Sequence, residues 1–563
     1  MRFVDSRRLT GPNILAERPL AVLDLTLDGA DPAAFEARWH EIVVRYADAL
    51  GWPHPTFHRR DYPDALSLAF SAPLDQLYTA TEVNDRAWFE LTGEPPPDSE
   101  YGQESDAEAL ARMRAAAASE ADPGLLLLIE AAASHGVTLL HDDELVSLGM
   151  GRYSQSWPLP ELPDPGALGW APYRDVPVGL VTGTNGKSTS ARYAAAILGA
   201  SGRCVGLSST DWIRAGDEVL DRGDYSGPGG ARAVLRHPRV DAAVLETARG
   251  GIKRRGLALA RADAALITNV AEDHLGDFGV PDVAELLELK WVVTTAVREQ
   301  GLLVLNADDP MLVARAEGYP GHIAWYGTDV SQEPLRSATA SGTAAALEAG
   351  ELVLYADGRR TPLLPAAEVA MSLEGLARHN LSNALGAALL AHSLGADSIA
   401  IAAGLRDADD DDNPGRMGRM RINGATVLVD FAHNPHGLDA LFAVARAVPA
   451  RRKLLLIGQA GDRRDEDIRA LALEAWSLGL DRIIIKEMAN YARGRPHGEV
   501  AGILRDAFLE LGADPAMLAY HEDELDAVDA AVAWAEPGDL AVLLIHERIE
   551  AAVARLRDAA DVV

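Results

Sequence analysis

The sequence predicts a multidomain α/β protein, with a central parallel sheet that carries a phosphate-binding loop, a C-terminal doubly wound α/β domain and an N-terminal α+β domain. Three observations support this fold class. The chain has 563 residues, too many for one hydrophobic core. Short apolar strands alternate with helical patterns after the first third of the chain, as in parallel sheets. A proline-rich stretch at residues 157–165 and an acidic stretch at 407–415 interrupt the pattern and are typical of linkers.

These linkers divide the chain into three predicted domains, residues 1–165, 166–415 and 416–563. The first combines a strand-like run at residues 20–27 with helical patterns at 33–50 and 107–135. In the second, apolar runs predict strands at 178–182, 242–245, 264–268 and 302–305. In the third, they predict strands at 426–429, 453–457, 482–485 and 540–544.

Composition excludes several classes of function. The formal net charge is −32, which repels nucleic acid and anionic membranes, and no basic run compensates for it. The single cysteine, Cys204, excludes an internal disulfide and suits a reducing compartment. Residues 1–8 lack the apolar core of a signal peptide, and apolar runs such as 125–129 are too short to span a bilayer. We therefore expect a soluble, cytoplasmic protein.

Residues 178–189, VGLVTGTNGKST, predict a phosphate-binding loop between a strand and a helix. Gly183 and Gly186 allow backbone amides to face a triphosphate, Lys187 neutralises its charge, and the Ser188 hydroxyl suits magnesium. The general pattern G-x-x-x-x-G-K-[ST] requires glycine at position 181, where this chain has Val181. The loop is therefore a variant of that pattern.

Further polar residues follow the predicted strands, where open parallel sheets bind their ligands. Glu246 ends one strand and is a candidate magnesium ligand. His274, in the run 268–276, is a second candidate ligand, although a single histidine is more often a cap or a core residue. Lys290 lies among apolar residues of a helix, where a lysine usually extends its amine to water.

Nucleotide-binding candidates continue along the chain. Asn306 and the run 378–383, RHNLSN, carry amides that match the donors and acceptors of a purine, although such residues are also ordinary in turns. Arg416, after the acidic stretch, can bind phosphate with two hydrogen bonds. The run 429–435, VDFAHNP, adds Asp430 and His433.

In their order and composition, these motifs resemble those of the Mur ligase superfamily, whose members use ATP to join an amine to a carboxylate. The resemblance implies that ATP and Mg²⁺ are required and that Lys187, His274 and Lys290 are catalytic. It implies metal binding by Ser188, Glu246, His274 and Lys290, with Lys290 carbamylated by carbon dioxide in some members. It implies nucleotide binding by Gly183, Thr184, Asn185, Gly186, Lys187, Ser188, Thr189, Asn306, His379, Asn380, Asn383, Arg416, Asp430 and His433.

Within that superfamily, the runs 7–14, 147–152, 224–232, 461–469 and 493–499 resemble the cyanophycin synthetases. Those enzymes also carry an ATP-grasp domain, for which the roughly 30 residues between Arg152 and Gly183 leave no room, since a domain of this kind needs about 100 or more. The resemblance implies an amino acid, such as arginine, joined to an aspartyl carboxylate, and a homodimer or homotetramer. Substrate-binding candidates are Arg249, Asp462, Arg493 and Glu499.

The sequence therefore predicts an ATP-dependent amide or isopeptide ligase that forms an acyl phosphate and acts on small amino acids or peptides. Two alternatives remain. One is a cell-wall precursor or folylpolyglutamate-type ligase, which accounts for the central motifs but not for the N-terminal and 493–499 matches. The other is an inactive ATP-binding scaffold, which is at odds with the complete set of candidate catalytic residues.

Overall fold

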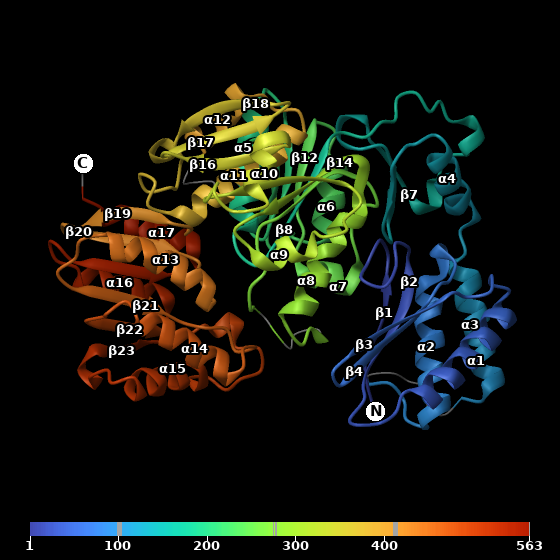
Figure 1. Ribbon diagram of the computed structural model, residues 1–563. Helices are drawn as coiled ribbons and strands as arrows, with labels where there is room; N and C mark the ends of the chain where they lie inside the picture. The colour runs from blue at the N-terminus through green and yellow to red at the C-terminus, as the bar shows by residue number, and fades with distance from the viewer. Residues whose placement is uncertain (98–103, 274, 276–278, 409–414, 562–563) are drawn as a thin grey trace.

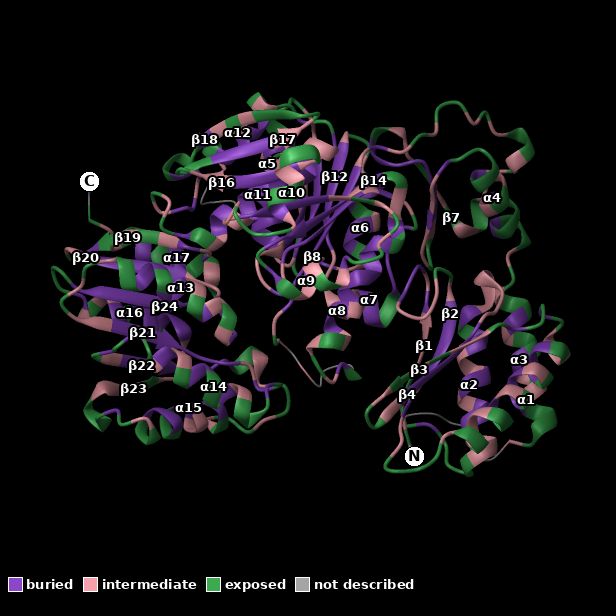
Figure 2. Ribbon diagram, in the orientation of Figure 1, coloured by how far each residue is buried: buried purple, intermediate pink, exposed green. Residues whose placement is uncertain are grey.

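The computed structural model describes residues 1–97, 104–273, 275, 279–408 and 415–561. Within these residues the strands form four sheets, and Figure 1 shows the largest in the middle of the molecule. The N-terminal sheet lies on one side of it and the C-terminal sheet on the other. Figure 2 shows the strands of the central and C-terminal sheets buried beneath their helices.

The N-terminal sheet is antiparallel and has helices on one face. Its order is β1-β2-β4-β3, with β1 Arg2–Leu9, β2 Leu20–Thr26, β3 Phe57–Tyr62 and β4 Ala65–Phe70. The helices are α1 Ala33–Leu50, α2 Leu77–Thr92 and α3 Asp106–Glu120. Trp39, Phe70 and Trp88 form much of the core between the two layers. Segregated helices on an antiparallel sheet define the α+β arrangement that was predicted.

The helical pattern predicted at residues 107–135 forms two helices, α3 and α4 Pro123–Ser134. Pro123 occupies the first turn of α4, and Asp122 Oδ1 accepts a hydrogen bond from Leu125 N at 2.9 Å. Proline has no amide hydrogen to continue a helix, so the chain restarts there with its own cap.

A small antiparallel sheet follows, with β5 Leu139–His141, β6 Leu145–Leu148 and β7 Gln155–Pro158. Two single 3₁₀ turns, Leu159–Glu161 and Pro165–Ala167, then lead to the central sheet.

The central sheet has 11 strands in the order β11-β10-β9-β12-β8-β13-β14-β15-β16-β17-β18. From β9 to β16 neighbouring strands are parallel, and antiparallel hairpins extend both edges. The strands are β8 Val178–Thr182, β9 Val205–Ser208, β10 Trp212–Ala215, β11 Glu218–Arg222, β12 Ala242–Glu246, β13 Ala262–Ile267, β14 Val297–Asn306, β15 His322–Gly327, β16 Ala344–Glu348, β17 Glu351–Ala356 and β18 Arg359–Pro365.

Helices cover both faces of this sheet, so its central strands are apolar throughout. Along β8, for example, Leu180 packs into one core and Val181 into the other. One face carries α5 Lys187–Ala200, α11 Arg378–Ser393 and α12 Ser398–Asp407. The other carries α6 Pro228–Leu235, α7 Arg249–Arg255, α8 Val283–Trp291, α9 Pro310–Arg315 and α10 Leu335–Ser341.

The C-terminal sheet has six strands in the order β19-β20-β24-β21-β22-β23, parallel except at the β19 edge. They are β19 Gly418–Ile422, β20 Ala425–Asp430, β21 Lys453–Ile457, β22 Arg482–Lys486, β23 Leu518–His521 and β24 Leu540–Leu544. One face packs against α13 Pro435–Ala447, α14 Asp465–Trp476 and α15 Glu499–Glu510, the other against α16 Glu524–Trp534 and α17 Ile549–Asp558.

The predicted fold class is confirmed: a parallel-rich central sheet, a second α/β sheet and an N-terminal α+β part. The exact limits of the three predicted domains stay a prediction. In the part of the chain that the structure describes, no helix combines the length and apolar character needed to cross a bilayer.

Candidate nucleotide and substrate site

The phosphate-binding loop leaves the carboxyl end of β8, where the strand order reverses between β12 and β13. Gly183 has φ 146° and Gly186, the N-cap of α5, has φ 80°. A Cβ atom at Gly183 would lie 1.9 Å from Thr268 Oγ1, and one at Gly186 would lie 2.2 Å from Asn383 Oδ1. Only glycine fits either position, so the loop lies close against its neighbours at the amino end of α5, the kind of site that binds anions.

Backbone and side-chain hydrogen bonds hold the loop against the end of β13. Thr184 N donates to Asn269 O at 2.8 Å, and Asn185 N donates to Asn269 Oδ1 at 2.9 Å. Thr268 Oγ1 donates to Asn185 O at 2.6 Å. Asn269 therefore orders the loop, a role that its place in the run 268–276 indicated only indirectly.

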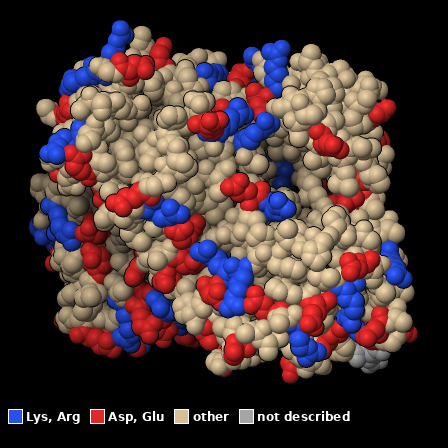
Figure 3. Space-filling view, turned by 45° about the vertical axis from the view of Figure 1, so that its right-hand side comes forward, with Lys and Arg blue, Asp and Glu red and all other residues tan. Residues whose placement is uncertain are grey.

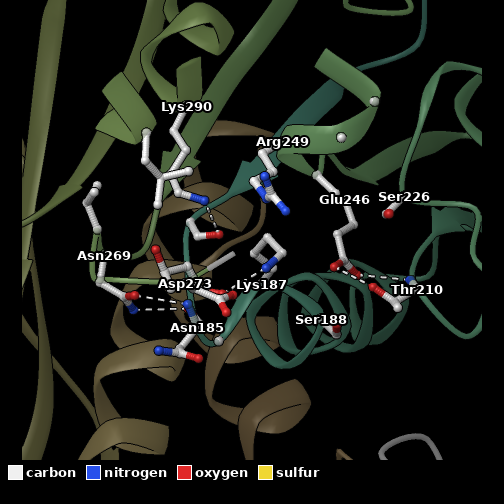
Figure 4. Close-up of a pocket in the computed structure, with 18 of the residues that line it drawn as sticks. Asn185, Lys187, Ser188, Thr210, Ser226, Glu246, Arg249, Asn269, Asp273 and Lys290 are labelled. Atoms are coloured by element: carbon white, nitrogen blue, oxygen red, sulfur yellow. Dashed lines mark hydrogen bonds between the residues drawn. The ribbon is translucent and has the colours of Figure 1, made fainter. Parts of the chain in front are cut away.

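Lys187 starts α5 and turns back into the loop. Its Nζ donates to Thr184 O at 2.9 Å. Burial lowers the pKa of Lys187, and the carboxylates of Glu246 and Asp273 oppose that shift. Figure 4 shows these three side chains facing the same space.

Oxygen donors gather beside Lys187. Glu246 ends β12 and is 1% exposed, and its carboxylate accepts hydrogen bonds from Thr210 Oγ1 at 2.8 Å and Thr210 N at 3.2 Å. Ser188, also buried, lies near it in Figure 4. A carboxylate and a hydroxyl fit the hard oxygen ligands of Mg²⁺. Among the described residues no group of three or more His, Cys, Asp and Glu side chains could hold a metal ion, and His274, the second predicted ligand, lies outside the described residues.

Lys290, on α8, does not extend its amine to water. It is 3% exposed, and its Nζ donates to Gly183 O at 2.8 Å. Burial, and secondarily the charge of Lys187, hold the pKa of Lys290 well below its usual value. A lysine amine reacts with carbon dioxide in its uncharged form, which the lowered pKa favours, so carbamylation of Lys290 stays a prediction with a chemical basis.

The predicted adenine-binding amides are partly engaged with the protein. Asn306 Nδ2 donates to Thr268 O at 3.0 Å and its Oδ1 accepts from Asp308 N at 3.0 Å. Asn383 Nδ2 donates to Asn380 Oδ1 at 3.2 Å. These contacts fix the amide orientations, and each Asn side chain retains hydrogen-bonding capacity for a ligand.

The C-terminal domain closes directly on the phosphate-binding loop. Asn434 Nδ2 donates to Asn185 Oδ1 at 3.0 Å, and Asn185 Nδ2 lies 2.9 Å from His436 Nδ1. Arg463 Nη2 lies 3.0 Å from Asp273 Oδ1. The sequence motifs contain Asn434 and Arg463 but gave no reason to single them out, because only folding shows that they face the loop.

Three predicted residues of the C-terminal part, Arg416, Asp430 and His433, line the same side of the cavity. Asp430 accepts hydrogen bonds from Met417 N and Ala432 N, both at 2.8 Å, so its carboxylate joins the segment before β19 to the loop after β20. Arg416 lies over the Phe431 ring, 4.8 Å from the centroid, and its Nη2 is 3.8 Å from Asp211 Oδ2. His433 Nε2 lies 3.7 Å from Asp273 Oδ2.

Most of these groups line one cavity of about 1790 Å³, whereas Thr268, Asp211, Asn434 and Arg463 lie outside its lining. Arg249, Asp462, Arg493 and His379 line it as well, and burial lowers the pKa of His379. The substrate candidate Glu499 is not among the lining residues; it lies in the first turn of α15 and pairs with Arg495 Nη1 at 2.7 Å.

The cavity also extends to the N-terminal domain, through Asp5, Ser6, Arg7, Arg8, Tyr78 and Thr81. Figure 3 shows acidic and basic side chains interspersed over one face of the molecule, with a hollow near its middle.

The loop, the buried lysines and the closing C-terminal sheet define a protein of the Mur ligase family. Residues 181–391 match the Mur ligase middle domain and residues 415–544 match the glutamate ligase domain of Mur ligases. The chain belongs to this family.

The chain is similar to the cyanophycin synthetase of Crocosphaera subtropica. The two are 36% identical over 371 residues, which cover 65% of this chain and 42% of that protein. The UDP-N-acetylmuramyl-tripeptide synthetase of Deinococcus radiodurans is 28% identical, covering 69% of this chain and 79% of that protein. Among solved structures, E. coli FolC in complex with DHPP and ADP is similar with a TM-score of 0.50 and 20% identity, covering 68% of this chain and 89% of that one, and this likeness shows the fold alone.

The chain spans less than half the length of the cyanophycin synthetases that it matches, 42% for the one from Crocosphaera subtropica. This coverage is consistent with the predicted absence of an ATP-grasp domain. Between Arg152 and Gly183 the structure contains only β7, the two 3₁₀ turns and β8.

Proposed function

We propose that this chain is an ATP-dependent carbon–nitrogen ligase that activates a carboxylate as an acyl phosphate. The observation that carries the proposal is the convergence of Lys187, Glu246 and Lys290 beside the amino end of α5, in one cavity with the C-terminal domain. Binding of ATP alone would not require a large cavity that reaches all three parts of the chain.

In the proposed reaction the substrate carboxylate oxygen attacks the γ-phosphorus of ATP, and the bond to the β-phosphate oxygen breaks to release ADP. An amine then attacks the acyl carbon, loses its proton and displaces phosphate to give an amide. Lys187 and the amides of the loop offset the charge that moves through the phosphoryl group. The contacts of Asn434 and Arg463 with the central domain exclude water that would hydrolyse the intermediate.

Glu246 and Ser188, together with the predicted ligands His274 and Lys290, are the proposed magnesium ligands. Bound Mg²⁺ supplies positive charge at the phosphate oxygens. The two hydrogen bonds from Thr210 orient the Glu246 carboxylate for metal binding.

For the substrates, we propose an amino acid, arginine or another basic one, joined to the carboxylate of an aspartyl amino acid or peptide. The similarity to cyanophycin synthetases supports this choice. Arg249 and Arg493 are candidates for binding carboxylates, and Asp462 for binding an ammonium or guanidinium group; the predicted role of Glu499 requires it to turn toward the cavity. The proposed enzyme is cytoplasmic and is a homodimer or homotetramer.

The alternative acid substrates are cell-wall precursors, which have support from the Deinococcus radiodurans relative, and folates. The test is incubation of the protein with ATP, Mg²⁺, pooled amino acids and aspartyl peptides, with products read by mass spectrometry. A product heavier than its acid by one amino acid less water supports the proposal, and its acid component decides between the substrate classes.

Lys187→Met is expected to abolish both product and phosphate release. Lys453→Met is the matched control, because Lys453 also donates to a backbone carbonyl, Leu478 O at 3.0 Å, but does not line the cavity. If no combination of acid and amine accelerates phosphate release in the unmodified protein, the inactive scaffold is the correct interpretation.

A further inference from the structure

A buried ion pair lies in the C-terminal domain, outside the lining of the cavity. Lys486 ends β22 and Glu524 begins α16, and neither side chain has exposed surface. The Lys486 ammonium pairs with Glu524 Oε1. Burying two charges is costly, and an apolar pair of the same size is often as stable. A contribution to stability alone is therefore a weak explanation for this pair.

The Glu524 carboxylate also accepts hydrogen bonds from backbone amides of the turn that follows β24. His546 N donates to Oε1 at 2.8 Å, Glu547 N donates to Oε2 at 3.0 Å, and Arg548 N donates to Oε2 at 2.6 Å. One carboxylate thus holds three successive amides at the carboxyl edge of the C-terminal sheet. This is the edge that faces the phosphate-binding loop.

From this turn a first path leads to the nucleotide side of the cavity. His546 is buried, and its Nε2 lies 3.2 Å from Ala432 O, so Nε2 carries the proton because a carbonyl only accepts. The His546 ring also meets the Phe431 ring edge-on at 5.1 Å. The Arg416 guanidinium lies over the face of the Phe431 ring, and both residues line the cavity.

A second path leads to the substrate candidates. Glu547 Oε1 accepts a hydrogen bond from Asn490 N at 2.7 Å. The next residue, Tyr491, accepts from Gly461 N through its carbonyl at 2.8 Å, and the Arg493 guanidinium lies 5.5 Å from the Tyr491 ring centroid. Asp462 follows Gly461 directly.

We propose that Glu524 is a positioning residue that holds two loops of the active site in place. These loops are residues 431–433 on the nucleotide side and residues 490–493 on the substrate side. Lys486 neutralises the carboxylate and keeps it in place, and the amides of residues 546–548 transmit its position. The kinetic consequence of this inference rests on the proposed ligase function, whereas the ordering of the two loops follows from contacts within the protein.

The test uses the double variant Glu524→Gln/Lys486→Met, which removes both charges at nearly constant volume and leaves no unpaired ion. Asp539→Asn is the matched control. Asp539 is also buried, pairs with Arg452 and accepts a backbone hydrogen bond from Glu536 N at 3.1 Å, but it lies before β24, at the opposite edge of the same sheet.

In the double variant we expect faster amide hydrogen exchange over residues 431–433 and 490–493, and about tenfold weaker binding of a non-hydrolysable ATP analogue, the loss equivalent to one hydrogen bond. The KM of each substrate identified in the ligation assay should rise as well. The control should alter none of these, although both variants lower the unfolding midpoint. Equal exchange, affinity and KM in the double variant and the control would overturn the proposal.

If the double variant does not fold, Glu547→Ala tests the second path alone. Glu547 is only partly buried, so this variant should fold, with faster exchange at residues 490–493, a raised substrate KM and unchanged affinity for the ATP analogue. Unchanged exchange and KM would refute the proposal. The ligase function fails separately, if the unmodified protein neither binds the analogue nor forms an amide.

Discussion

Replacement of Gly186 by alanine should damage the phosphate-binding loop out of proportion to the one methyl group added. Gly186 has φ 80°, where a residue with a Cβ atom loses about 1–2 kcal/mol. The new Cβ would lie 2.2 Å from Asn383 Oδ1 and 2.9 Å from Asn383 Cγ, shorter than any real contact. Asn383 is 7% exposed and has little room to move away.

Movement of Asn383 breaks its hydrogen bond to Asn380 Oδ1, now 3.2 Å long, at a cost of about 1 kcal/mol. Together the two effects lower the free energy of unfolding by about 2–3 kcal/mol. The alternative is that the amino end of α5 shifts instead, and the amides that face phosphate lose their alignment. Either response should weaken ATP binding by at least about tenfold.

Denaturant unfolding and calorimetric titration with a non-hydrolysable ATP analogue measure the two effects. Gly199→Ala is the matched control, because Gly199 lies on the same helix, is exposed and has no atom within 4 Å of the place that the added methyl group would occupy. That control should gain about 0.5–1 kcal/mol and bind normally. Unfolding and affinity of Gly186→Ala equal to those of the unmodified protein would refute this account of the loop.

Three further predictions concern charged groups. Burial lowers the pKa of Lys290 in the folded protein, so the unfolded chain binds more protons between that lowered pKa and the usual lysine value, and stability should rise with pH over this interval. Lys290→Met should flatten this slope in unfolding series and abolish any bicarbonate dependence of ATP turnover, and an unchanged slope would contradict the lowered pKa. Arg463→Met removes the guanidinium that lies 3.0 Å from Asp273 Oδ1, and it should lower turnover about tenfold or more while the protein stays folded. Steady-state kinetics and circular dichroism check the two parts of this prediction. Unaltered turnover would show that closure does not depend on this pair. Burial raises the pKa of Asp85 to about 6, so stability should fall as the pH rises from the unfolded pKa of about 4 to 6, and stay lowered above it. Asp85→Asn should therefore stabilise the N-terminal domain by about 2 kcal/mol at pH 7.5 and not at pH 4. A gain that is equal at both pH values would be inconsistent with this cause.

Some of the site could be predicted from local sequence because its chemistry depends on backbone geometry. The glycines at 183 and 186 indicated a loop with conformations that other residues avoid, and both have positive φ angles. The apolar runs indicated parallel strands, and each one predicted in the central and C-terminal parts corresponds to a strand of the structure. The helical pattern at residues 107–135 was less informative, because periodicity continued across the Asp122–Pro123 break.

Roles that depend on distant partners were beyond the sequence. By its local pattern Lys290 looked like an ordinary amphipathic lysine, although the family resemblance implied a catalytic role, and only the packing of α8 against the loop shows that its amine is buried at Gly183 O. Likewise, Glu524 and Lys486 are 38 residues apart, and nothing local in either segment marks them as a pair.

The sequence by itself determined the phosphate-binding loop, the alternation of strands and helices and the family, because these follow from residue type and short-range spacing. Only the tertiary structure decided which side chains share the cavity, which amines have a lowered pKa and how the C-terminal domain contacts Asn185 and Asp273. The physical reason is that desolvation and ion pairing depend on distance in space, and strand order brings together residues that are hundreds of positions apart in the chain.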